Sequence, residues 1–174
     1  MEERINEAFE LGEALTVVGR QLHPGEPAPA FELDYFNPAT SAMEQVRLTD
    51  SAGKIRLLNV VNSIDTPVCQ IETHRWQSLS ADLPANVILY SISMDLPFAQ
   101  ARWHQLEGVN HQSLSAHRSE QFGQAYGVLL KEWRLLQRAV FVIDQQDQIR
   151  YAEYVADQML EPNYEATLKA VNSL

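Results

Sequence analysis

The chain contains one cysteine, Cys69, within the stretch SIDTPVC at residues 63–69. A cysteine is nucleophilic only as the thiolate, so a reactive one needs neighbours that stabilise the anion. Thr66 suits the N-cap of a helix and Pro67 its first position, where the missing N–H has no cost. Cys69 then becomes the third helical residue, beside unpaired backbone N–H groups and the positive end of the helix dipole. This spacing predicts a nucleophilic thiolate, with the Thr66 hydroxyl as a further hydrogen-bond donor to the sulfur.

The same cysteine also has a purely structural interpretation. A single free cysteine often behaves as a small apolar residue buried in the core. The spacing alone leaves both interpretations open. A lone cysteine cannot form an intramolecular disulfide, so nothing in the sequence requires an oxidising compartment.

The elements around SIDTPVC indicate how the cysteine is positioned. The run IRLLNVV (55–61) is typical of a buried central strand, and it places the cysteine turn at the edge of a sheet where open α/β folds hold their sites. Residues 67–83 predict a helix, residues 86–94 a second buried strand, and residues 96–108 a second helix that ends at Gly108. The apolar positions expected along the first of these helices are Val68, Ile71, Trp76 and Leu79. Its carboxylates, including Glu72, are expected on a solvated face.

The second half of the chain completes an α/β pattern. Two β-rich runs, 139–143 and 149–155, flank the polar turn DQQDQ and predict a hairpin, and residues 162–174 predict a closing helix. A parallel pair of strands continued by an antiparallel hairpin is typical of a thioredoxin-like three-layer α/β sandwich with a central mixed β-sheet. The segment from Glu2 to Leu22 is ambiguous between helix and strand, and we favour strands.

Length and charge limit the function classes. At 174 residues the chain is expected to form a single domain, residues 1–174. Thirteen basic and 23 acidic side chains give a formal net charge of −10, which disfavours nucleic acid and anionic membranes as partners. No apolar run approaches the roughly 18 to 20 residues of a membrane span, and the N-terminus lacks the pattern of a signal peptide. We therefore expect a cytoplasmic protein.

Five blocks of sequence resemble the thiol peroxidase (Tpx) subfamily of the peroxiredoxins. The blocks are SIDTPVC, SMDLPFAQARW, EQFGQAYGV, RAVFVID and EPNYEATLKAV, and they occur in the family's order from about Ala14 to the C-terminus. The resemblance implies a thioredoxin-like peroxiredoxin fold with an N-terminal β-hairpin, here about residues 1–24. It also implies a homodimer that reduces hydrogen peroxide or organic hydroperoxides without a cofactor.

The resemblance assigns roles to three residues. Cys69 matches the peroxidatic cysteine, which attacks the peroxide and becomes a sulfenic acid. Thr66 matches the threonine that hydrogen-bonds the thiolate and orients the peroxide. Arg138 matches the arginine that stabilises the thiolate and polarises the O–O bond; without the resemblance, a surface ion pair is the ordinary interpretation of this arginine.

Two positions depart from the family pattern. His104 stands where the family usually has a resolving cysteine, so an external thiol, either a thioredoxin-like protein or a small thiol, must resolve the sulfenic acid. Asn62 stands where peroxiredoxins carry a proline that shields the sulfur, and an amide there is expected to admit more water. These departures favour an alternative: a catalytically degenerate scaffold that acts as a peroxide-sensing or protein-binding module.

The histidines do not suggest a different chemistry. His74 follows Cys69 by five residues, which turns it away from the sulfur on a helix and argues against a Cys-His catalytic pair. His111 and His117 lie in apparent loops without a second ligand at short spacing, so we predict no metal. His104 is expected to pack or to lie at the surface, and an acid-base role in resolution is its second interpretation.

Overall fold

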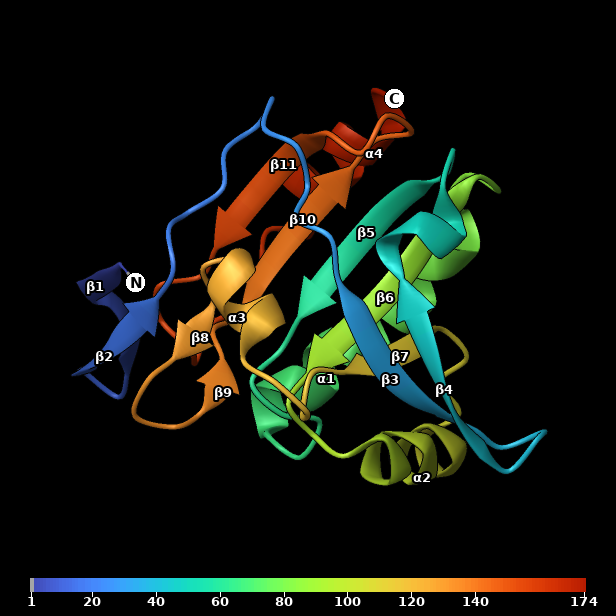
Figure 1. Cartoon of the computed structure of the whole chain (residues 1–174), viewed down its shortest axis with the longest axis horizontal. Helices are drawn as coiled ribbons and strands as arrows, with labels where there is room; N and C mark the ends of the chain where they lie inside the picture. The colour runs from blue at the N-terminus through green and yellow to red at the C-terminus, as the bar shows by residue number, and fades with distance from the viewer. Residues whose placement is uncertain (1) are drawn as a thin grey trace.

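A seven-stranded mixed sheet forms the centre of the molecule in the computed structural model, which describes residues 2–174. Strands β5, β6 and β7 are parallel, and the outer strands pair antiparallel on both sides (Figure 1). In spatial order the strands are β11 (Ile149–Tyr154), β10 (Ala139–Ile143), β5 (Ile55–Val60), β6 (Val87–Ser93), β7 (Gln112–Ser115), β3 (Glu32–Asn37) and β4 (Ala42–Arg47). The predicted mixed sheet and the hairpin β10–β11 are confirmed.

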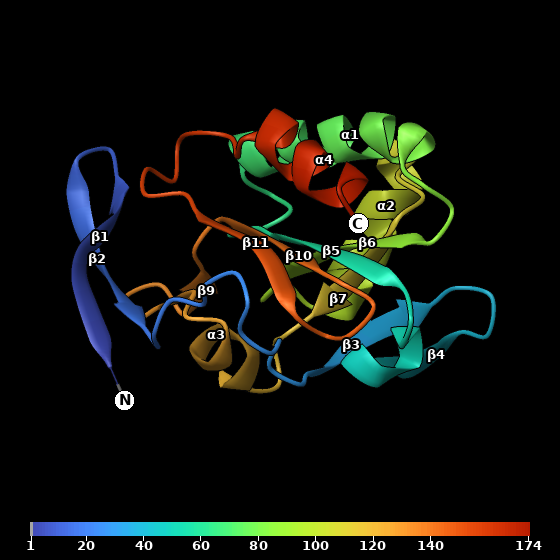
Figure 2. The ribbon, with the colours of Figure 1, turned by 90° about the horizontal axis from the view of Figure 1, so that it is seen from above.

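Helices cover both faces of this sheet. Helices α1 (Pro67–Leu79), α2 (Pro97–Glu107) and α4 (Tyr164–Asn172) lie on one face, and the short α3 (Gln121–Ala125) lies on the other (Figure 2). Single-turn 3-10 helices follow β4 and α1, at Leu48–Ser51 and Ser80–Asp82. The predicted three-layer arrangement is confirmed. Gly108 ends α2 in the left-handed conformation, as its position in the sequence suggested.

The N-terminal segment forms strands, as favoured from the sequence. Strands β1 (Glu3–Glu10) and β2 (Glu13–Val18) make an antiparallel hairpin. This hairpin joins β8 (Leu129–Leu130) and β9 (Leu135–Leu136) in a second, four-stranded sheet. The two short strands carry no periodic pattern and were not predicted, because two residues are too few to show a period.

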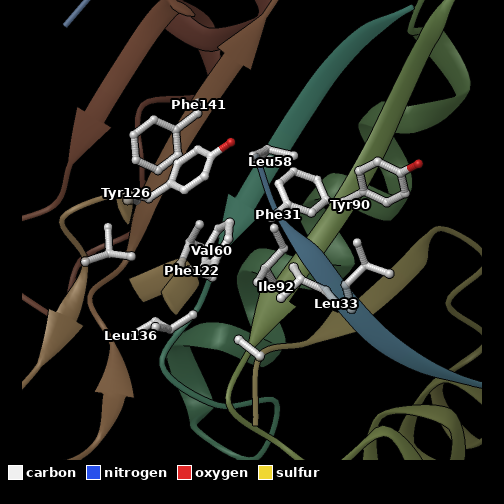
Figure 3. Packing of buried hydrophobic residues seen from close by; sticks show 14 of the residues in the cluster. Phe31, Leu33, Leu58, Val60, Tyr90, Ile92, Phe122, Tyr126, Leu136 and Phe141 are labelled. Atoms are coloured by element: carbon white, nitrogen blue, oxygen red, sulfur yellow. The ribbon is translucent and has the colours of Figure 1, made fainter. Parts of the chain in front are cut away.

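Two hydrophobic clusters fill the spaces on either side of the central sheet. On one side Leu58 and Val60 of β5 pack with Phe31 and with aromatic side chains from α3 and β10 (Figure 3). On the other side Leu57 packs against Trp76 of α1 and residues of α4. The alternation along β5 follows from the two-residue period of a strand. Because both faces of β5 are covered, its end is a rigid point from which the next loop starts.

The buried face of α1 differs from the predicted apolar stripe. Ile71 is 58% exposed, whereas the buried residues are Cys69, Glu72, Thr73 and Trp76. The stripe was predicted by hydropathy, and hydropathy places glutamate and threonine outside. Among residues 2–174, no helix is long and apolar enough to cross a membrane.

Candidate active site

Cys69 lies in the first turn of α1, in the register expected from the sequence. Thr66 is the N-cap with an extended backbone, and Pro67 is the first helical residue. The first hydrogen bond of the helix runs from the Gln70 N–H to the Thr66 carbonyl, at 3.0 Å. The backbone N–H of Cys69 therefore precedes the ladder of the helix and has no acceptor within it.

The loop between β5 and α1 is held by one carboxylate from the neighbouring strand connection. Asp95 follows β6 and accepts hydrogen bonds from the Ser63 hydroxyl at 2.7 Å and the Ile64 backbone N–H at 2.8 Å. The Ser93 hydroxyl donates to the same carboxylate at 2.7 Å. Since β5 and β6 are parallel, their carboxyl ends meet at one edge, and Asp95 ties the two connections together there.

The structure brings Arg138 to the sulfur of Cys69. Nη1 of Arg138 lies 3.3 Å from Sγ, and both side chains are fully buried. The sheet explains the contact: Arg138 directly precedes β10, and Ala139 pairs with Val60 at the end of β5. Two segments 69 positions apart thus meet at the start of α1. A buried cation at this distance stabilises a thiolate more than it would in water.

Glu72 belongs to the site, and the prediction that it lies on a solvated face is wrong. Its side chain is 0% exposed, and Oε2 accepts a short hydrogen bond from the same Nη1 of Arg138. Burial raises the pKa of the Glu72 carboxyl to about 7, although the attraction of Arg138 opposes the shift. Burial opposes the charge on Arg138, but Glu72 and the sulfur outweigh it and raise the pKa of the guanidinium. The spacing of Cys69 and Glu72 could have predicted that Glu72 lies beside the cysteine, since positions i and i+3 share a face of a helix.

A pair of buried amides completes the surroundings of the guanidinium. Oδ1 of Asn62 accepts from Nη2 of Arg138 at 3.3 Å and lies 4.0 Å from Cys69 Sγ. Gln158, which no sequence motif marked, accepts from the Arg138 backbone N–H at 2.9 Å and from Asn62 Nδ2 at 3.0 Å. The expectation that Asn62 admits water to the sulfur is wrong, because Asn62 is only 4% exposed and Cys69 is 0% exposed.

The Thr66 hydroxyl does not point at the sulfur as predicted. Its Oγ1 donates to the Ser63 carbonyl at 3.1 Å and so closes the turn before the helix. Thr66 remains at the N-cap, three residues before Cys69, and its half-buried side chain lies at the entrance to the helix start.

The histidines lie apart from the sulfur. His104 Nε2 pairs with the Ser113 hydroxyl at 2.6 Å, and its ring meets His111 edge to face at 5.8 Å. Burial lowers the pKa of His104 to about 4, which favours the neutral ring near pH 7. His74 is exposed and pairs with Glu107 at 3.2 Å. Within residues 2–174 no group of three His, Cys, Asp or Glu side chains is arranged to bind a metal ion.

A cavity of about 780 Å³ lies between α2 and the β3–β4 hairpin, and His104 and His111 line it. Neither Cys69 nor Arg138 is among its lining residues, so this cavity is separate from the buried thiol. The thiol site brings together a candidate nucleophile, a cation beside it and the N–H groups at the start of a helix.

The sequence and the fold match one family of known proteins. Residues 24–152 match the model of the AhpC/TSA family. The thiol peroxidase of Bacillus subtilis (strain 168) is 42% identical over 164 residues, which cover 94% of this chain and 95% of the relative. The thiol peroxidase of Listeria innocua is 43% identical over 157 residues, covering 90% and 92%.

Solved structures agree with these relatives. A crystal structure of a peroxiredoxin-like protein from Aquifex aeolicus superposes with a TM-score of 0.83 at 27% identity, over 99% of each chain. The thiol peroxidase from Chromobacterium violaceum superposes with a TM-score of 0.84 at 22% identity, over 99% of this chain and 98% of the other. The second likeness concerns the fold, which has the thioredoxin-like layers and the N-terminal hairpin expected from the sequence.

Proposed function

The chain belongs to the AhpC/TSA family, in its thiol peroxidase subfamily, and we propose that it reduces hydroperoxides at Cys69 with electrons from an external thiol. The observation that carries the proposal is the 3.3 Å contact between Arg138 Nη1 and Cys69 Sγ at the start of α1. A structural core cysteine has no need of a buried guanidinium, whose desolvation is costly. The ion pairing of Arg138 with Glu72 offsets that cost and leaves the same nitrogen in contact with the sulfur.

In the first step the Cys69 thiolate attacks one oxygen of the peroxide. The S–O bond forms as the O–O bond breaks, and the leaving hydroxide or alkoxide takes up a proton from solvent, so the products are a sulfenic acid and water or an alcohol. Arg138 stabilises the thiolate before the attack and faces the oxygen on which negative charge develops. The unpaired N–H of Cys69 is a second donor to the reacting oxygens.

Thr66 has a supporting role in this proposal. Its hydroxyl donates to the Ser63 carbonyl in the structure, and a rotation about χ1 turns it toward a bound peroxide. Thr66 thus orients the peroxide while the turn of residues 63–66 remains closed by its backbone hydrogen bond.

In the second step an external thiol attacks the sulfenic sulfur, releasing water and leaving a mixed disulfide on Cys69. A second thiol then attacks that disulfide and returns the Cys69 thiolate. The chain has no other cysteine, so both electrons come from outside. The reductant in this proposal is a small thiol or a thioredoxin-like protein. We further propose that residues 1–174 act as one domain and that the protein works as a homodimer in the cytoplasm.

The test measures the reaction of the reduced protein with hydrogen peroxide. Competition with a haem peroxidase gives the rate constant, and intact mass after addition of a thiol shows whether Cys69 is restored. We expect oxidation at least about 100-fold faster than that of free cysteine, and full recovery of the starting mass. The variant Cys69→Ser should consume no peroxide.

Two arginine variants separate activation of the sulfur from a general loss of charge. Arg138→Met should lower the rate by about 100-fold or more, whereas Arg102→Met, which removes an exposed arginine on α2, should leave it unchanged. Oxidation of the parent at the rate of free cysteine, or an oxidised product that no thiol reverses, would refute the proposed activity.

A further inference from the structure

We propose that Asn62 and Gln158 form an amide clamp that positions Arg138 against the sulfur of Cys69. Both are positioning residues: Asn62 acts through the guanidinium, and the Gln158 side chain acts through the Arg138 backbone N–H and Asn62. The inference rests on the proposed function. The clamp is the pair of side-chain amides together with their contacts to Arg138 described below.

The chemistry of the neighbours determines how both amides are oriented. Nδ2 of Asn62 lies 2.6 Å from the Leu136 carbonyl, which only accepts, so the amide oxygen must face Nη2 of Arg138, which only donates. Nε2 of Gln158 lies 2.7 Å from the Val155 carbonyl, so its oxygen must face the Arg138 backbone N–H. A flip of either amide would oppose donor to donor and acceptor to acceptor. The two amides then join through Asn62 Nδ2 and Gln158 Oε1.

The clamp holds the guanidinium at Nη2, the terminal nitrogen that does not contact the sulfur. Nη2 donates to Asn62 Oδ1 at 3.3 Å and to the Gln158 backbone carbonyl at 2.9 Å. Nη1 is left to the sulfur and to Glu72. Because a guanidinium is planar and rigid, fixing Nη2 also fixes the direction of Nη1.

The contact with Glu72 alone does not fix the direction of Nη1 of Arg138. Its Oε2 competes with the sulfur for Nη1, and no contact of Glu72 restrains Nη2. Without Asn62 Oδ1 only the Gln158 backbone carbonyl restrains Nη2, so the guanidinium is held less firmly against the sulfur. The amide oxygen at 4.0 Å from Sγ accepts from the protonated thiol, so Asn62 contacts the sulfur only weakly and acts mainly through Arg138.

A double-mutant cycle tests whether Asn62 acts through Arg138. The proteins are the parent, Asn62→Ala, Arg138→Met and the double variant, with Arg138→Lys in place of Arg138→Met if the latter does not fold. The control is Asn59→Ala, which removes another buried amide, three residues earlier on β5; Asn59 accepts from Trp76 Nε1 and does not contact Arg138. Each protein is assayed for its rate with hydrogen peroxide and for alkylation of Cys69, the only thiol, by iodoacetamide.

We expect Asn62→Ala to lower the peroxide rate by about 10- to 100-fold with Arg138 present and by no more than about 3-fold with Arg138 absent. Asn59→Ala should lose stability but keep the rate. The inference is overturned if Asn62→Ala reacts as fast as Asn59→Ala, or if its effect is equally large without Arg138, which would indicate a general loosening.

Failure of the proposed function gives a different result. In that case the parent itself reacts with peroxide no faster than free cysteine does. The alkylation rates of the same four proteins then decide the inference, since Arg138 acts on the thiolate whether or not peroxide is the substrate. Non-additive effects of the two substitutions on the alkylation rate support the clamp, and additive effects overturn it.

Discussion

Glu72→Gln should change how the stability of the protein depends on pH. Glu72 is fully buried beside Arg138, and burial raises the pKa of its carboxyl to about 7, from an ordinary value of 4.5. Glutamine has nearly the same size and keeps an oxygen that accepts from Arg138, but it does not titrate. Comparing the two proteins over a range of pH therefore isolates the contribution of this one proton.

The sign follows from which state binds the proton more tightly. Between pH 4.5 and about 7 the folded protein holds the Glu72 proton and the unfolded chain does not, so the parent loses stability as the pH rises through this interval. The interval corresponds to about 3 kcal/mol. The contribution of the neutral form is fully present below pH 4.5 and is lost above the folded pKa.

Urea unfolding followed by circular dichroism gives the free energy of unfolding of the parent and of Glu72→Gln. Titrations of other groups are common to both proteins and cancel in the difference. From about pH 4 to about pH 8 the difference should move by about 3 kcal/mol in favour of the variant. Glu13→Gln, at an exposed glutamate on β2, is the control and should show a small, nearly constant difference. A constant difference for Glu72→Gln would mean that Arg138 compensates burial in full, which would refute the reasoning.

Three further substitutions, two at supports of the site and one at a tight backbone contact elsewhere in the fold, are tested by thermal and urea denaturation. Asp95→Asn should cost about 1 to 3 kcal/mol, because its carboxylate accepts from the loop before α1, and an unchanged Tm would contradict this role. Trp76→Phe should cost a similar amount, since it leaves Asn59 Oδ1 buried without its 2.9 Å donor; a loss no larger than about 0.5 kcal/mol would argue against that bond. Gly127→Ala should cost more than about 1 kcal/mol, because its φ is +64° and a Cβ would lie 2.0 Å from the Arg20 carbonyl oxygen. Gly12→Ala, at φ +85° with open space around it, should cost less, and equal losses would exclude the clash as the cause.

Local patterns predicted the parts of the fold that depend on neighbouring residues. The N-cap and proline at the start of α1, the glycine at the end of α2 and the polar turn between β10 and β11 all act within a few positions of the chain. Each of these patterns has a local physical cause, so a single sequence was enough to predict the element that it starts or ends. The place of Cys69 in the first turn of α1 was predicted for the same reason.

The polar partners around the thiol depend on contacts that are distant in sequence. Glu72 is a polar residue, and its burial is stabilised by Arg138, which lies 66 positions later in the chain. Gln158 lies in an irregular segment after β11, with no periodicity, and it gains its role from the Arg138 backbone N–H. No spacing rule links these residues. The resemblance to a family supplied Arg138, but it could not supply Asn62 as a partner, because that residue departs from the family pattern.

The burial of Cys69 places two opposite demands on the site. Complete burial strengthens the effect of Arg138 on the thiolate, since charges interact more strongly away from water. A small peroxide needs little room, but the reducing thiol is larger, and it must reach the sulfur of a side chain that is 0% exposed. His104, in the position of a resolving cysteine, is bonded to Ser113 and offers no internal thiol, so every turnover requires this outside approach. The hydrogen bonds from Ser63 and Ile64 to Asp95 fix the connection that leads into α1, which supports the first step of the proposed cycle, while the second step depends on how a larger thiol reaches the buried sulfur.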